Sequence, residues 1–137
     1  MGEIRVKVLL TNSHDDTRFR AGELPKESIR SCDADAMVET DAVRSVIPSH
    51  VLQRLGVSVR STRVAEYADG RKETVGMSDG IIFDLMGRDT LEEALILGDE
   101  VLIGQTVLEK LDLLADCANR RLLPNPAHPD QPVSKVK

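Results

Sequence analysis

The sequence contains few aromatic residues and no tryptophan: Phe and Tyr together make up 2% of its 137 residues. Proteins that hold single-stranded nucleic acid stack the bases on exposed aromatic rings inside a basic groove. The formal net charge of −5 is also unsuited to phosphate binding, which needs concentrated Lys and Arg. The composition therefore argues against a nucleic-acid partner, and it requires a core built from Val, Leu, Ile and Ala.

Cysteine and histidine are also scarce. Cys32 and Cys117 are the only two cysteines, and without a partner spacing they predict neither a zinc site nor a disulfide framework. We expect reduced thiols in a cytoplasmic protein. The three histidines are not at ligand spacing, so no metal and no cofactor is predicted. No apolar run is long enough for a signal peptide or a membrane span, so no membrane partner is expected either.

The remaining pattern is that of one domain with many short strands. Ile4, Val6 and Val8 alternate with charged residues, as in a strand with one buried face. Further strands are expected at 36–38, 46–47, 57–67, 73–75, 81–85, 94–97 and 101–104, with short helices after Pro48 and at 107–111. This pattern predicts an all-β, closed or sandwich-like domain with two short helices over residues 1–124.

Two segments are expected to lie outside this regular structure. Residues 14–31 are polar and interrupted by Gly22 and Pro25, which predicts a long loop with room for a helical turn after the proline. Residues 125–137 are rich in proline, which cannot hold a regular strand ladder, so an extended tail is expected there.

Several segments, in order along the chain, resemble the retroviral-type (retropepsin-like) family of aspartic peptidases. Met37-Val38-Glu39-Thr40-Asp41-Ala42 stands where the family has two apolar residues and Asp-Thr-Gly-Ala. Tyr67-Ala68-Asp69-Gly70-Arg71 is similar to the tip of the family's flap hairpin, and Asp-Gly is itself a strong hairpin signal. Val46-Ile47-Pro48 with the following helix, Leu102-Ile103-Gly104 with the next helix, and the strand at 119–124 complete the match. The match is closest to stand-alone bacterial members.

The resemblance implies a retropepsin-like acid protease barrel that forms one subunit of a two-fold homodimer. It also implies an endopeptidase whose substrate is an extended peptide or protein. The residues it places in the site are Glu39, Thr40 and Asp41 as the catalytic triplet, with Ala42, Ala68, Asp69 and Gly70 in substrate binding.

The triplet departs from the family's Asp-Thr-Gly at two positions. Glu39 keeps the carboxyl group but is one methylene longer, and a displacement of about 1 Å in a preformed site can cost about 10²-fold in rate. Asp41 adds volume and charge where glycine lets the substrate backbone pass. Impaired or absent turnover is therefore expected. Three alternatives remain open: a non-catalytic peptide-binding module, a two-fold Mg²⁺ or Ca²⁺ site at Glu39 and Asp41, and two solvated surface acids.

Overall fold

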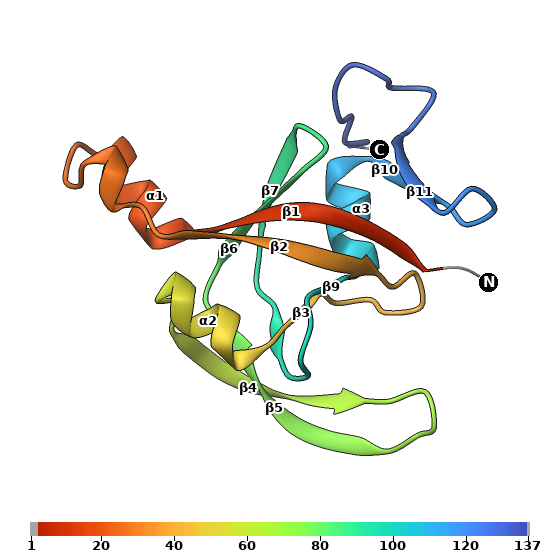
Figure 1. Ribbon diagram of the computed structural model, residues 1–137, viewed down its shortest axis with the longest axis horizontal. Helices are drawn as coiled ribbons and strands as arrows, with labels where there is room; N and C mark the ends of the chain where they lie inside the picture. Colours follow the sequence, from red (N-terminus) through yellow and green to blue (C-terminus); the bar gives the residue numbers. More distant parts are fainter. Residues whose placement is uncertain (1–2, 137) are drawn as a thin grey trace.

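The computed structural model describes residues 3–136 (Figure 1). Its strands are β1 (Ile4–Asn12), β2 (Ser31–Val38), β3 (Val46–Ile47), β4 (Val59–Glu66), β5 (Lys72–Ser78), β6 (Ile81–Leu85), β7 (Arg88–Glu92), β8 (Leu95–Ile96), β9 (Leu102–Ile103), β10 (Leu113–Asp116) and β11 (Arg121–Pro124). Its α-helices are α1 (Ser13–Arg20), α2 (Ser49–Leu55) and α3 (Gln105–Leu111), and a 3₁₀ turn covers Lys26–Ser28. The predicted all-β class is confirmed.

Most strands belong to one curled sheet in the order β4-β5-β8-β3-β9-β2-β1-β6-β7, and β10 pairs with β11 separately. Strands β1 and β2 form a long antiparallel pair, and β1 also pairs with β6 (Figure 1). Strand β9 lies between β2, to which it is parallel, and β3, to which it is antiparallel. The connection from β2 to β3, residues 39–45, therefore has to cross the end of β9.

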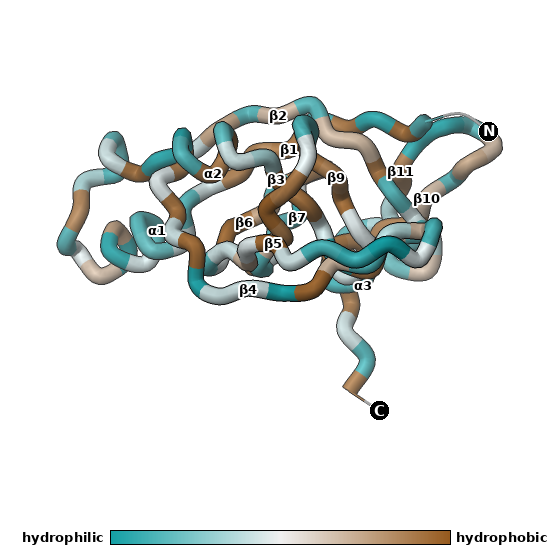
Figure 2. Tube along the Cα trace, turned by 90° about the horizontal axis from the view of Figure 1, so that it is seen from below, coloured by the Kyte–Doolittle hydropathy of each residue, from teal (hydrophilic) through white to brown (hydrophobic). Residues whose placement is uncertain are grey.

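The core is aliphatic, as the composition requires. Alternate residues of β1 point inward, and α2 and α3 each contribute an apolar face of three residues that are almost fully buried. Figure 2 shows this distribution, with the hydrophobic segments gathered in the interior strands and the β4–β5 hairpin largely hydrophilic. Helix α2 is capped by Gly56, whose φ of 65° is the left-handed conformation that glycine adopts readily at helix ends.

The expected loop at residues 14–31 is wrong in its first half, because residues 13–20 form α1. The Asn12 side chain caps this helix by accepting a hydrogen bond from the Asp15 N–H at 3.0 Å. Acidic residues occupy its first turn, and Arg18 and Arg20 lie in its last turn, which suits the helix dipole. The helix is polar on almost every side, so it lacks the apolar periodicity by which helices are predicted. The helical turn after Pro25 is confirmed.

Strand β7 was not predicted, because its two buried residues, Arg88 and Glu92, are charged. Burial of a charged side chain is favourable only when partners satisfy it, and those partners come from distant parts of the chain. Arg88 Nη1 donates to the carbonyl oxygens of Leu111 and Asp112, at 2.9 and 3.0 Å. The strand is therefore set by tertiary contacts.

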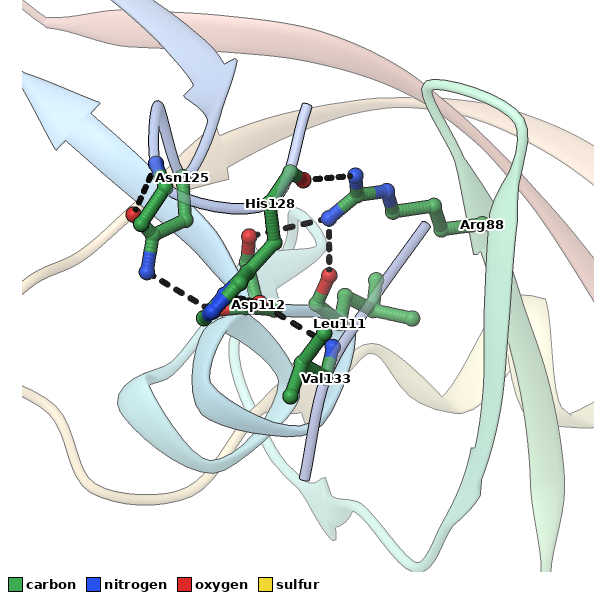
Figure 3. Close-up of polar contacts among 7 residues, drawn as sticks. Arg88, Leu111, Asp112, Asn125, His128 and Val133 are labelled. Atoms are coloured by element: carbon green, nitrogen blue, oxygen red, sulfur yellow. Dashed lines mark hydrogen bonds and ion pairs between the residues drawn. The ribbon is translucent and has the colours of Figure 1, made fainter. Parts of the chain in front are cut away.

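The segment after β11 has neither helix nor strand among its described residues, yet its first part is fastened to the domain (Figure 3). The carboxylate of Asp112 accepts hydrogen bonds from Asn125 Nδ2 at 3.0 Å, His128 Nδ1 at 2.6 Å and the Val133 N–H at 3.1 Å. Arg88 Nη2 donates to the His128 carbonyl oxygen at 2.9 Å. Residues 125–133 are thus anchored at the end of α3.

Candidate functional site

The triplet lies in a tight loop that begins where β2 ends. The Glu39 N–H donates to the Ile103 carbonyl oxygen at 2.9 Å, which extends the β2–β9 pairing by one residue. The Ala42 N–H then donates to the Glu39 carbonyl oxygen at 3.2 Å and closes a turn around Thr40 and Asp41. Glu39 and Thr40 are half-buried, whereas Asp41 is exposed. The three residues therefore share one ordered loop.

The polar groups of the triplet are linked through a single peptide group. The Asp41 N–H donates to Glu39 Oε1 at 3.2 Å. The carbonyl oxygen of that same peptide group, which belongs to Thr40, accepts a hydrogen bond from Gln105 Nε2 at 2.6 Å. The Glu39 carboxylate is thus turned back over its own loop, and the loop is held from the far side by the first residue of α3.

The start of α3 also holds the rest of the loop through its backbone. The Gln105 N–H donates to the Ala42 carbonyl oxygen at 2.8 Å, and the Thr106 N–H donates to that of Val43 at 3.0 Å. Gly104, just before the helix, makes the closest approach: a Cβ atom placed on it would lie 2.6 Å from the carbonyl carbon and oxygen of Arg44. Only glycine leaves room for the two chain segments to lie this close.

A buried polar group supports this junction from β7. Glu92 is 3% exposed; it accepts a hydrogen bond from Thr106 Oγ1 at 2.5 Å and forms an ion pair with Lys110 Nζ at 3.1 Å. The Thr106 hydroxyl oxygen also lies 3.1 Å from the Val43 carbonyl oxygen. The triplet loop with the residues that follow it, α3 and β7 are therefore joined by hydrogen bonds.

The hairpin tip that was predicted to bind substrate is held by short-range interactions. Asp69 Oδ1 accepts the Arg71 N–H at 2.9 Å, and Gly70 has φ of 85°. The Arg71 guanidinium lies 4.2 Å from the centre of the Tyr67 ring. The Tyr67 hydroxyl donates to Glu73 at 2.5 Å, and this bond raises the pKa of Tyr67. Asp69 is therefore a turn residue within the β4–β5 connection.

The triplet loop and the hairpin tip lie at the same end of the molecule, opposite α1 (Figure 1). Ala42 is in the loop, and Ala68, Asp69 and Gly70 are exposed at the tip. A half-open polar cavity of about 520 Å³ lies elsewhere, lined by Ser13, Arg30 and Asp79 among others. The predicted site residues thus form two groups on one side of the molecule, and that cavity belongs to neither.

Two solved structures are similar in fold to this chain. The EIAV protease in complex with an inhibitor is similar with a TM-score of 0.55 and 14% sequence identity, over 79% of this chain and 86% of that one. The retroviral protease-like domain of Ddi1 from Leishmania major also has a TM-score of 0.55 and 14% identity, over 98% of this chain and 92% of that one. The chain has the retropepsin fold. No family model matches the sequence, and no curated protein matches it either.

The sequence indicated a site loop at residues 39–42 but not the contacts that hold it. Gly104 was identified as part of an apolar motif, whereas Gln105, Thr106 and Glu92 were not weighed, since their partners are up to 65 residues away. Within residues 3–136, no group of three or more His, Cys, Asp or Glu side chains is arranged to hold a metal ion. No helix in this range has the length and apolar character needed to cross a membrane.

Proposed function

We propose that this protein is a retropepsin-like aspartic endopeptidase that works as a homodimer with weak or absent turnover. The observation that carries the proposal is the placement of Glu39 at the end of β2, in a loop fixed by β9 and α3. The retropepsin fold supports it, since two solved proteins similar to this chain are a retroviral protease and a retroviral protease-like domain. The bacterial and cytoplasmic setting rests on sequence resemblance and on two unpaired thiols, Cys32 and Cys117.

The chemistry needs two carboxyl groups that share a proton and activate a water molecule for attack on the peptide carbonyl. One chain supplies one triplet, so a second subunit has to bring its own Glu39 across a two-fold axis. Thr40 is the member that matches the family, and we assign it to holding the two loops together. Ala42 and the hairpin tip, Ala68 to Gly70, would face an extended peptide between loop and flap.

Asp41 is the main obstacle to turnover in this scheme. Its side chain is exposed at the loop where the family's glycine gives room to the substrate. A carboxylate there narrows the floor of the cleft and adds a second negative charge per subunit. The longer Glu39 side chain is already folded back onto the Asp41 N–H, so it reaches less far out of the loop than its length allows. Both features favour slow cleavage.

The test is cleavage of a peptide library from pH 3 to 8 by the parent chain and by the double variant Glu39→Asp/Asp41→Gly. We expect very slow cleavage by the parent and a strong increase in the double variant. The control is Glu39→Gln/Asp41→Gly. It removes the Asp41 side chain but also replaces the Glu39 carboxyl group by an amide, so it should be inactive. A parent rate within the ordinary enzyme range of about 1–10³ s⁻¹ would contradict the impairment, and an inactive double variant would contradict the peptidase assignment.

The exposed Asp41 side chain also favours a second candidate, a peptide-binding module of the same fold without catalysis. Peptides would then pair with the β4–β5 hairpin as an added strand. Binding of labelled library peptides to the parent, measured by fluorescence polarisation with intact peptide recovered afterwards, would support this candidate. Cleaved peptide would support the peptidase.

A further inference from the structure

Among the described residues, Gln105 is the only helix residue whose side chain forms a hydrogen bond with the backbone of the triplet. Its Nε2 atom is 2.6 Å from the carbonyl oxygen of Thr40. That oxygen and the Asp41 N–H belong to the same peptide group, and the N–H donates to Glu39 Oε1 at 3.2 Å. A continuous path of two hydrogen bonds therefore joins the amide of Gln105 to the carboxylate of Glu39.

We infer that Gln105 is a positioning residue for Glu39, acting through the peptide group that links Thr40 to Asp41. This inference rests on the proposed function for its catalytic meaning. The hydrogen bond from Gln105 fixes the plane of that peptide group and so the direction of its N–H. A hydrogen bond to the carbonyl also polarises the peptide, which strengthens donation from the N–H at its other end. Donation to a carboxylate is the stronger, charge-assisted kind.

The side chain of Gln105 is separable from the other bonds at the start of α3. The Gln105 N–H and the Thr106 N–H hold the carbonyl oxygens of Ala42 and Val43, and these backbone bonds do not depend on the residue type at position 105. Gln105 is only half-buried, so a side chain of similar length fits there. Removal of its amide should therefore change the Thr40–Asp41 peptide group while the helix and the remainder of the loop stay in place.

Two substitutions of similar size distinguish donation from packing. Gln105→Met keeps the length and removes the donor at every pH. Gln105→Glu presents a carboxylate to the Thr40 carbonyl oxygen at neutral pH, but a protonated carboxyl group can donate again below about pH 4. The matched control is Gln53→Met, on the exposed side of α2.

The readout is the Asp41 amide in ¹H–¹⁵N spectra of the full chain, compared between variants at the same pH. In Gln105→Met we expect the Asp41 proton resonance at higher field and about fivefold faster hydrogen exchange, the effect of losing one hydrogen bond. Gln105→Glu should show the same or a larger change at pH 7 and return towards the parent resonance at pH 3.5. Gln53→Met should leave the Asp41 resonance where it is in the parent. An Asp41 amide that is unchanged in Gln105→Met would overturn the inference. So would equal responses of Gln105→Glu and Gln105→Met at pH 3.5.

Cleavage gives a second readout that separates this inference from the proposed function. If the parent chain cleaves peptide, Gln105→Met should lower kcat about fivefold with little change in KM, because the side chain does not reach the substrate. A change confined to KM would contradict positioning of Glu39. If neither the parent nor the Glu39→Asp/Asp41→Gly double variant cleaves any peptide, the proposed function fails, and the Asp41 amide still decides whether Gln105 orients the Glu39 carboxylate.

Discussion

Asp15 is almost fully buried, and its carboxylate accepts three hydrogen bonds from Arg30. The Arg30 N–H and Nε donate to Oδ2 at 3.0 and 2.8 Å, and Nη2 donates to Oδ1 at 3.0 Å. The guanidinium also lies against Gly56, where an added Cβ would be 2.0 Å from Nη1. The pair therefore joins both ends of the segment 13–30, which connects β1 to β2, and closes it onto the end of α2.

The first prediction concerns stability at acidic pH. The side-chain hydrogen bonds from Arg30 lower the pKa of Asp15 to about 2. A carboxyl group with a depressed folded-state pKa stabilises the folded state above its unfolded value of about 4, and this contribution is lost as pH falls towards 2. Asp15→Asn should lower the free energy of unfolding by about 1–3 kcal/mol at pH 7, because it removes the charge from the hydrogen bonds with Arg30. The loss is limited to this range because Arg30 is half-exposed and solvent screens part of the pair. Urea denaturation at pH 7, 4 and 2.5 measures this difference.

The control for this prediction is Asp16→Asn. Asp16 is in the same helix, and it pairs with Arg20 at 3.0 Å on the exposed side of α1. Surface pairs of this kind contribute about 0–1 kcal/mol. The Asp15→Asn defect should shrink between pH 4 and 2.5, whereas the small Asp16→Asn effect should not. A defect of equal size at all three pH values would show that the Asp15 charge is unimportant.

The second prediction concerns the anchored C-terminal segment. Donation from the Asn125 amide, followed by the Val133 N–H and the His128 ring, lowers the pKa of Asp112. Asp112 has φ of 56°, a conformation that asparagine also accepts, so Asp112→Asn removes the charge without changing the backbone preference. We expect faster hydrogen exchange at Val133 and faster proteolysis within residues 125–133. In the parent chain the same release should begin as pH falls below the ordinary aspartate value of about 4.

The matched control is Asp130→Asn, an exposed acid in the same segment. It removes one negative charge from the tail and leaves the three bonds to Asp112 intact. Equal protection of the Val133 amide in the parent, Asp112→Asn and Asp130→Asn would show that Asp112 does not hold the segment.

The sequence predicted the elements whose signal is local. The buried positions of β1 and the β4–β5 turn at Asp69-Gly70 follow from patterns a few residues long, and the structure agrees with them. Helix α1 was missed because its stability comes from the Asn12 cap and from Asp15, whose partner Arg30 lies fifteen residues away. A polar segment carries no sign of such a partner until the chain is folded.

In the candidate site, too, some parts were predicted from the sequence and others depend on contacts between distant residues. The triplet and the motif Leu102-Ile103-Gly104 were both predicted by resemblance to the family. Gly104 is required by its close approach to Arg44, and Gln105 donates a hydrogen bond to Thr40. Both contacts join residues about sixty positions apart. Such contacts depend on β9 lying between β2 and β3, which no local pattern specifies.

The third prediction tests that close approach. Gly104→Ala places a methyl group 2.6 Å from the backbone of Arg44, and backbone cannot move aside as a side chain can. We expect a loss of about 1–3 kcal/mol in the free energy of unfolding and shifted amide resonances across residues 39–45. The control is Gly80→Ala, where the atoms nearest to the added carbon belong to the side chains of Leu91 and Ser13. Equal stability losses in the two variants would contradict a special role for Gly104.

The fourth prediction concerns assembly and charge. A two-fold dimer would bring two Glu39 and two Asp41 carboxylates near its axis, and like charges in close proximity repel by about 1 kcal/mol or more per pair at 4 Å. Asp41→Asn should therefore tighten the dimer by about tenfold at pH 7 and low salt, and Glu39→Gln should act in the same direction. The difference should shrink at an ionic strength of about 1 M, where the screening length is about 3 Å. Sedimentation over a range of protein concentrations measures the dissociation constant of each chain.

The control for the assembly prediction is Glu23→Gln, an exposed acid in the connection from β1 to β2, whose helix α1 lies at the opposite end of the molecule. It changes the net charge per subunit by the same amount as Asp41→Asn. If general repulsion between two acidic chains were the cause, all three variants would tighten the dimer alike. Stronger dimers in Asp41→Asn and Glu39→Gln alone place these carboxylates at the subunit contact. A parent chain that sediments as a monomer even at high concentration would remove the two-fold site, and with it the proposed peptidase.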